Sequence, residues 1–296
     1  MEARKAVLYI AADVVPSSCP IMLAIRSISL CFILCLILPS APFAFAHNAG
    51  VDESANGARV TMSQNDPYAQ PSRVRLEGQV EHSEHLPELD ERFLPGRRFD
   101  AKAFRTAPTK EEWVKIPSWL AGVFAIRKSI LTAVTNYEKG ERKDFNRNEK
   151  VETHAVYGHQ KDAAGNIWQL NRTPFSAVVR MGRVTQYSRG DTAEFLEVCP
   201  DHVVIRHTGP TLLVNSETGM IVRASQTESI TVCTPDGANV LARGSIKAFD
   251  AQGRAIDCAE RIAFLRRTKP FQADPTTEES FKRFLFSQRA NAESHR

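Results

Sequence analysis

Short runs rich in Val, Ile, Thr and aromatic residues, separated by turn signals, dominate the chain beyond Pro117. This pattern is typical of an antiparallel all-β domain in which tight turns join neighbouring strands. It predicts about ten strands in roughly 150 residues. The predicted strands are Ala121–Val134, Val151–Gln160, Ile167–Leu170, Phe175–Tyr187, Ala193–Val198, Val203–His207, Thr211–Val214, a run from Met220, Ile230–Cys233, Asn239–Phe249 and Arg254–Arg267.

A meander of this kind closes into an up-and-down barrel or folds as a sandwich. We favour closure, because it removes the exposed sheet edges. The predicted fold class is mainly β: an antiparallel up-and-down β-barrel over residues 113–270, with a short N-terminal helical turn before it and a C-terminal helix after it.

Two helical segments are expected to flank the barrel. Thr109 and Glu112 have the spacing of a capping box, which predicts a short helical turn over residues 113–116. In the C-terminal segment (271–296), Phe281, Phe284, Leu285 and Gln288 recur at helical spacing. We prefer the interpretation that this helix docks its Phe face on the barrel over the alternative that it binds a partner.

An apolar run lies near the start of the chain. Ile28–Leu38 is apolar apart from one serine, and its length of about eleven residues is short of the roughly 20 that a membrane helix needs. Ala44 and Ala46 are the small residues of a cleavage site, so residues 1–46 are predicted to be a signal peptide. Translation from Met22 would give a leader of ordinary length, and an uncut N-terminal anchor is the alternative. The mature protein is expected in the periplasm or outside the cell, without a transmembrane span.

Residues 47–112 are polar, with scattered Gly, Pro and Ser and no sustained periodicity. They predict a disordered or extended arm. His82 and His85, with Glu81 and Glu84, would share a helix face and could gather a metal ion. A solvated charged stretch is the preferred interpretation, and no metal site is predicted.

Lys115–Phe124, followed by a meander of this length, is similar to the start of a lipocalin-type (calycin) barrel. In that family a G-x-W motif opens the first strand, and a basic residue late in the last strand covers its tryptophan. Here Gly122-Val123-Phe124 would be the counterpart, with Arg266 or Arg267 as the covering residue. The second family motif, T-D-Y, is absent. The resemblance implies a small apolar ligand held inside the barrel.

Strand alternation selects candidate ligand-binding residues, with Phe124 assumed to face inward. They are Phe124, Tyr157, Trp168, Phe195, Ile205 and His207. His207 shares its face with Val203 and Ile205, whereas Arg206 lies on the opposite face. If the large side chains of this set line the interior, they fill it. If small side chains on the same strands line it, a cavity remains. The sequence does not decide between the two. The small residues are Ala125, Ala155, Ala193, Ala242 and Gly244.

The composition excludes some classes of protein. With 43% hydrophobic and 24% charged residues and a net charge of +4, the 296-residue chain is an ordinary globular sequence without a basic stripe. Nucleic-acid binding is therefore not expected. No nucleophile elbow, H-E-x-x-H motif or phosphate loop occurs, so no catalytic residues are predicted and an enzyme is less favoured. Glu194, Glu197 and Glu228 are interpreted as solvated carboxylates.

Three of the six cysteines, Cys199, Cys233 and Cys258, follow the predicted cleavage site. One disulfide among them, with one thiol left over, is possible in an exported protein; three free thiols are the alternative. Cys199 precedes His202 by three residues, but no orienting carboxylate is evident, so Cys199 is interpreted as structural or disulfide-bonded.

Two functions remain. In the first, the barrel binds a small apolar or amphipathic molecule; its cofactor, if any, is left unidentified. In the second, the barrel is filled by its own side chains, and the protein binds another protein in the cell envelope.

Overall fold

The computed structural model describes residues 7–9, 81–105 and 109–294, with side chains from 81–105 and 109–290. Apart from residues 7–9, the predicted signal peptide and the first part of the predicted arm lie outside the described residues. Among those described, no helix has the length and apolar character needed to span a bilayer.

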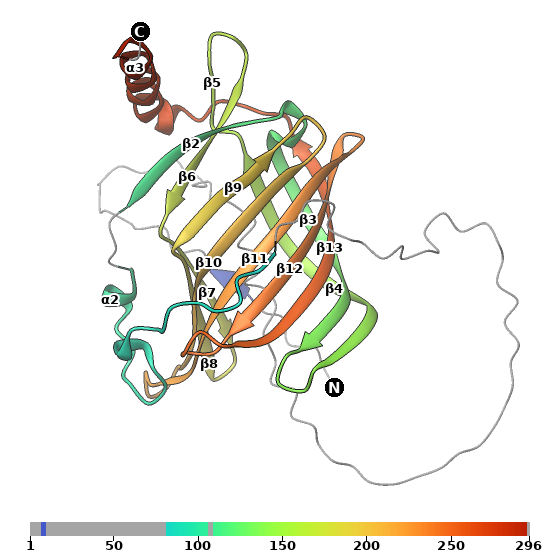
Figure 1. Ribbon diagram of the computed structural model, residues 1–296, viewed down its shortest axis with the longest axis vertical. Helices are drawn as coiled ribbons and strands as arrows, with labels where there is room; N and C mark the ends of the chain where they lie inside the picture. Colours follow the sequence, from blue (N-terminus) through green and yellow to red (C-terminus); the bar gives the residue numbers. More distant parts are fainter. Residues whose placement is uncertain (1–6, 10–80, 106–108, 295–296) are drawn as a thin grey trace, which may run out of the picture. The chain divides into compact units, whose positions relative to one another are not determined.

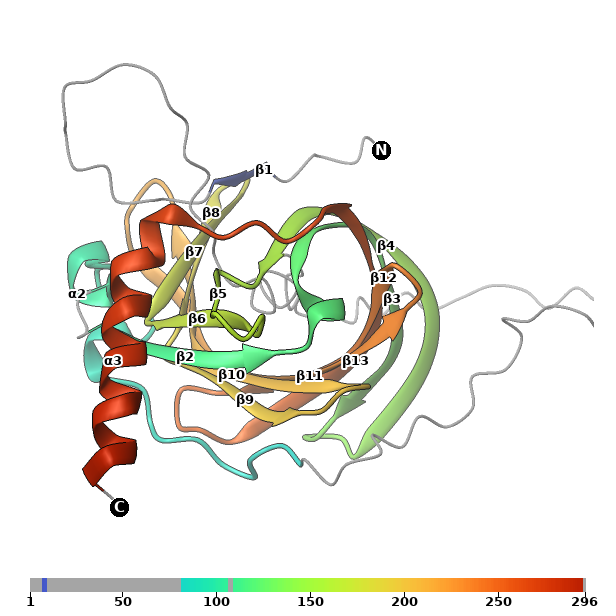
Figure 2. The same cartoon turned by 90° about the horizontal axis from the view of Figure 1, so that it is seen from above.

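Ten of the described strands form one antiparallel sheet that curls into a half-barrel (Figures 1 and 2). From edge to edge its order is β1-β7-β8-β10-β11-β12-β13-β3-β4, and β9 pairs with the first half of β10. Its strands are β1 (Val7–Tyr9), β3 (Gly122–Asn136), β4 (Glu141–Tyr157), β7 (Phe175–Met181), β8 (Val184–Gly190), β9 (Thr192–Val198), β10 (Val203–Asn215), β11 (Ile221–Asp236), β12 (Asn239–Phe249) and β13 (Ala255–Lys269). The predicted mainly-β antiparallel class is confirmed.

The sheet does not close on itself within the described residues, because its edge strands β1 and β4 are not paired with each other. The chain between β4 and β7 leaves the sheet. It forms β5 (Gln160–Lys161) and β6 (Ile167–Thr173), which join β2 (Lys110–Ile116) in a separate three-stranded sheet. This diversion explains why the meander gives a half-barrel instead of the closed barrel that we favoured.

The predicted helical turn over residues 113–116 is wrong, because this segment is strand β2. It pairs with β6 in unbroken register from Lys110↔Thr173 to Ile116↔Ile167. Trp, Val and Ile favour a strand when a partner supplies the hydrogen bonds. A short helical turn does precede the barrel, but after Pro117, at η2 (Ser118–Leu120).

Strand boundaries differ from the sequence prediction mainly where a tight turn was missed. The predicted strand Phe175–Tyr187 is the hairpin β7–β8, which turns at Gly182 with φ of +64°. Glycine reaches this left-handed conformation without a steric penalty. Conversely, the separate predicted segments within 203–214 and 220–233 are the long continuous strands β10 and β11.

The C-terminal helix α3 (Glu278–Ser294) follows η3 (Pro275–Thr277). The sequence led us to prefer docking on the barrel, but the helix packs its aromatic side chains on the small three-stranded sheet. Phe281 is buried against Trp113 of β2, with ring centroids 4.8 Å apart, and Phe284 packs on Trp168 of β6 at 5.1 Å.

Residues 82–105, part of the segment predicted to be a disordered or extended arm, contact the sheet. Residues 82–89, which we call the strap, cross the sheet, and η1 (Glu91–Phe93) and α2 (Ala101–Arg105) follow. Phe93 and Phe104 are buried against Leu212 and Ile221. These two sheet residues point away from the face that carries Val203 and Ile205, so this segment covers the convex face.

Candidate functional site

The concave face of the half-barrel carries most of the predicted ligand-binding residues. Side chains from β3, β4, β10, β11, β12 and β13 meet in one apolar cluster. Strands far apart around a curled sheet can bring their side chains together only on its concave side. This cluster therefore identifies the inner face of each strand.

At one end of this face, Phe124, Tyr157 and Ile205 are fully buried and Phe195 packs against them. The rings of Phe124 and Tyr157 lie 6.1 Å apart, edge to face. Leu120 of η2 belongs to the same cluster. The four predicted residues thus fill their end of the half-barrel with packed side chains.

His207 lies on the same face as Ile205, and Arg206 on the other, as strand alternation predicted. The His207 side chain is buried, its ring stands perpendicular to that of Phe175 at 6.0 Å, and burial lowers its pKa to about 3. The imidazole is therefore neutral at pH 7. Arg206 forms an ion pair with Glu194 on the opposite face.

Trp168 does not belong to this group. It packs under α3 with Phe281 and Phe284, and its indole N–H donates to the Asp162 carboxylate at 3.0 Å. The sequence assigned it to the interior because Ile167–Leu170 was taken as a barrel strand. The structure places that segment in the separate small sheet, which corrects the assignment.

The small residues contribute to the same interior as the large ones. Ala155 and Ala242 lie in the apolar cluster, and Ala193 and Gly244 pair with His207 and Thr231 of the concave face. Ala125 lies on the opposite face. The interior is therefore neither wholly bulky nor wholly small, and Ala155 is the direct cross-strand partner of Phe124.

Beyond the apolar end, the concave face becomes polar, which the sequence did not indicate. Ser229 and Thr231 pair across strands with His207 and Ile205, and Ser129 pairs with Ala263. All three are buried. Within the described part of the chain, the hydroxyls of Ser129 and Ser229 make no hydrogen bond. Buried hydroxyls without partners are uncommon and favour a bound polar group or water beside them.

Charged side chains follow further along this face. Arg261, which pairs with Gly244, contacts Glu149 with Nε and Oε2 3.3 Å apart, and both side chains are only 10% exposed. Arg147 reaches the other carboxylate oxygen of Glu149 at 2.7 Å. Burial raises the pKa of the neighbouring Asp257. The concave face therefore runs from apolar through hydroxyl-lined to charged.

Of the two arginines expected to cover Phe124, Arg267 lies over its ring. The Arg267 guanidinium lies 5.2 Å from the centroid of the Phe124 ring, and it donates to the backbone carbonyl of Trp119. It therefore ties β13 to η2 and closes the apolar end through a cation–π contact.

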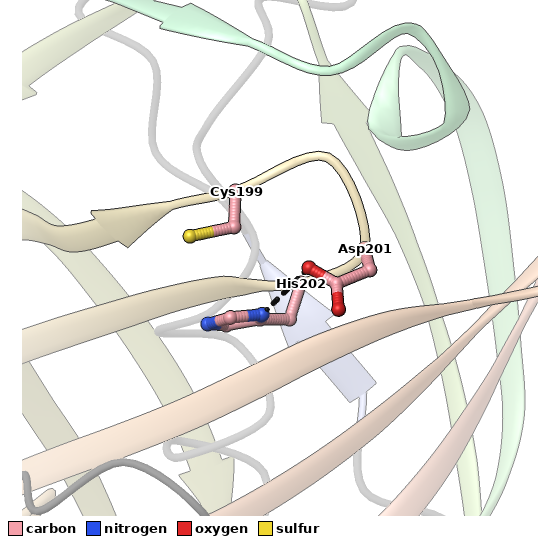
Figure 3. Close-up of side chains that lie close together, drawn as sticks. All are labelled: Cys199, Asp201 and His202. Carbon is pink, nitrogen blue, oxygen red and sulfur yellow. Dashed lines mark hydrogen bonds and ion pairs between the residues drawn. The ribbon is translucent and has the colours of Figure 1, made fainter.

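The turn between β9 and β10 holds a group of polar side chains that was not predicted as a site. Cys199, Asp201 and His202 place a sulfur, a carboxylate oxygen and an imidazole nitrogen within 4.8 Å of one another (Figure 3). His202 contacts two carboxylates, with Nδ1 3.0 Å from Asp201 and Nε2 2.9 Å from Glu197. Together they raise the pKa of His202. The four-residue run C-P-D-H was the signal in the sequence.

All three cysteines of the barrel are thiols, so the disulfide considered from the sequence is not present among them. Cys233 belongs to the concave apolar cluster, whereas Cys258 lies on the opposite face of β13. Burial raises the pKa of the Cys258 thiol to about 11.

His82 binds Glu228 instead of forming a metal site with His85. Its Nδ1 lies 2.9 Å from Glu228 Oε2 and its Nε2 2.7 Å from Ser245 Oγ. The strap is extended here, so the shared helix face that a metal site required does not exist. Glu228 is buried, which corrects its interpretation as a solvated carboxylate.

Comparison with protein-family models, with curated proteins and with solved structures finds no match to this chain.

Proposed function

We propose that this protein is an exported carrier that binds a small apolar or amphipathic molecule on the concave face of its half-barrel. The observation that supports it most is the pair of buried hydroxyls, Ser129 and Ser229, which lack hydrogen-bond partners in the described residues. Binding sites of this class combine apolar walls with a few polar groups that fix orientation.

The gradient along the face suggests how the molecule lies. Phe175, Ala177 and Val179 of β7 offer an apolar wall opposite the hydroxyls, since their register with β8 places them on the concave side. The polar part would face His207 and Ser229. The lipocalin-like layout, with Arg267 over Phe124, is consistent with a carrier of this type.

A second candidate is a protein-interaction module of the cell envelope that holds no ligand. The observation in its favour is the packed cluster around Phe124, Tyr157 and Ile205, which fills one end of the interior. A barrel filled along its whole length would leave only its surface for binding.

Native mass spectrometry of protein purified gently from its host distinguishes the two. The carrier should retain a lipid, pigment or other apolar molecule, and should take up a fluorescent fatty-acid analogue. A clean apo mass together with no uptake of the analogue would favour the interaction module.

Matched variants of neighbouring residues test the site itself. His207→Ala should weaken uptake of the analogue by about tenfold, the loss of one hydrogen bond of roughly 1.4 kcal/mol. Arg206→Ala, on the opposite face, should leave uptake unchanged. His207→Phe keeps a flat aromatic ring and removes both nitrogens, so it separates a lost contact from the loss of the ring. Loss of uptake only in Arg206→Ala would contradict the assignment of the face.

A further inference from the structure

The turn between β9 and β10 carries a second, independent site. We propose that Cys199, Asp201 and His202 bind one divalent metal ion of the zinc class. The donor set is a thiolate, a carboxylate and an imidazole, all within 4.8 Å of one another (Figure 3). Thiolate and imidazole select zinc-like ions over magnesium and calcium, which prefer oxygen ligands alone.

The spacing of the Asp201 and His202 ligand atoms is close to that of a tetrahedral site. Asp201 Oδ1 and His202 Nδ1 are 3.0 Å apart. Two ligands on a tetrahedral zinc ion, each bound at about 2.0–2.1 Å, are separated by roughly 3.3 Å. The ion would take the place of the proton between Asp201 Oδ1 and His202 Nδ1. These two atoms need to move apart by only a few tenths of an ångström, roughly, to accept it.

The other imidazole nitrogen already has the partner that a metal-bound histidine requires. His202 Nε2 lies 2.9 Å from Glu197 Oε2. With the metal on Nδ1, the Nδ1 proton is released to solvent and the Nε2 proton stays donated to Glu197, which fixes the ring orientation. Metal-bound histidines almost always have such a carboxylate or carbonyl partner.

The turn is held in place independently of any metal. The Cys199 N–H donates to the His202 carbonyl at 2.8 Å, and the Trp119 indole N–H donates to the Pro200 carbonyl at 2.6 Å. The pairing of Val198 with Val203 closes its base. Because the backbone is fixed, binding orders only the ligand side chains, which lowers its entropic cost.

Three protein ligands leave the fourth position for water or an added ligand. The His202 side chain is 26% exposed and that of Asp201 82%, so solvent reaches this position. On binding, the metal–sulfur bond forms and the Cys199 thiol releases its proton to solvent, so uptake should release protons.

The test uses the full chain, dialysed against a chelator and titrated with Co²⁺ and then Zn²⁺. Co²⁺ should give a thiolate charge-transfer absorption that one equivalent saturates and that Zn²⁺ abolishes. Cys199→Ser should remove this absorption, and His202→Gln should weaken binding more than Glu197→Gln does. Loss of an orienting partner such as Glu197 typically lowers metal affinity about 10–100-fold.

Two variants serve as matched controls for the same residue types elsewhere. Cys258→Ser removes a buried thiol of β13, and His154→Gln removes an exposed imidazole of β4. Both should keep the absorption and the affinity. If Cys199→Ser retains the full absorption, or if no variant of the turn lowers affinity for Zn²⁺, the site is refuted.

Discussion

Replacing Glu228 should release the strap from the convex face of the sheet. The Glu228 side chain is only 1% exposed and accepts three hydrogen bonds: from His82 Nδ1 at 2.9 Å, from the Ser83 backbone N–H at 2.7 Å and from the Ser83 hydroxyl at 2.9 Å. These bonds lower the pKa of Glu228 against the opposing effect of burial. The carboxylate is therefore the main polar anchor of residues 82–83.

The free-energy cost of replacing Glu228 depends on whether the donors of His82 and Ser83 keep an acceptor. Glu228→Ala leaves three donors facing a cavity, and breaking a buried charged pair in this way costs about 3–5 kcal/mol. Glu228→Gln can keep the bonds with a rotated amide but loses their charge. Because hydrogen bonds to charged groups exceed neutral ones by roughly 1 kcal/mol each, the cost falls to about 2–3 kcal/mol.

Hydrogen exchange measures this loss locally. The amides of Leu86 and Leu89 donate to the carbonyls of Gly253 and Ala251 at 3.0 and 2.9 Å. In Glu228→Ala their protection should fall by about a hundredfold or more, since each 1.4 kcal/mol is a factor of ten. Glu217→Gln, which alters a 71% exposed carboxyl, is the control. Unchanged protection of both amides in Glu228→Ala would refute this account of the strap.

Lowering the pH should weaken the same hydrogen bonds between Glu228 and residues 82–83. Because the pKa of Glu228 is lower in the folded state than its ordinary value of 4.5, the ionised carboxylate stabilises the folded state at pH values above 4.5. This stabilisation is lost as the pH falls through the lower pKa of the folded state. The strap amides should therefore lose protection at acid pH in the wild-type chain. In Glu228→Gln, protection should already be low and should change less with pH.

Three further outcomes are expected. Phe124→Ala empties a fully buried position and should lower the free energy of unfolding by about 3–5 kcal/mol in urea titration, whereas Phe286→Ala, at a 75% exposed ring, should change it by less than about 0.5 kcal/mol. Gly253→Ala would place a Cβ 1.8 Å from the Leu86 carbonyl oxygen at φ of +81°, so the strap amides should lose protection while β10–β13 keep theirs. Burial lowers the pKa of His159 to about 4, so the free energy of unfolding should decrease as the pH is lowered from 6.5 to 4. His159→Gln should make the free energy of unfolding depend less on pH in this range.

Local signals in the sequence determined most of the strands. The turn Lys161–Asn166 does connect β5 and β6, and Asn239–Phe249 has the predicted bounds of β12. The alternation that separates His207 from Arg206 is also local, because successive side chains of any strand point to opposite faces. Helix α3 was recognisable because its aromatic residues repeat at helical spacing.

The partners of each strand were decided only by tertiary structure. Nothing local indicates that β6 pairs with β2 instead of β4, and this choice moves Trp168 out of the interior and leaves the half-barrel open. A distant residue also holds the turn that carries Cys199 and His202, because Trp119, 80 positions before Cys199 in sequence, donates to the Pro200 carbonyl.

Burial of polar groups likewise followed from contacts between distant segments. Glu228 looked solvated because its neighbours in sequence are polar, and it is buried because His82 and Ser83 cross over it. Alternation fixed which residues share a face, but not which face is concave, since Val203 and Val204 are equally apolar. Curvature settles this, because it brings Tyr157 of β4 and Ile205 of β10 together on one side only.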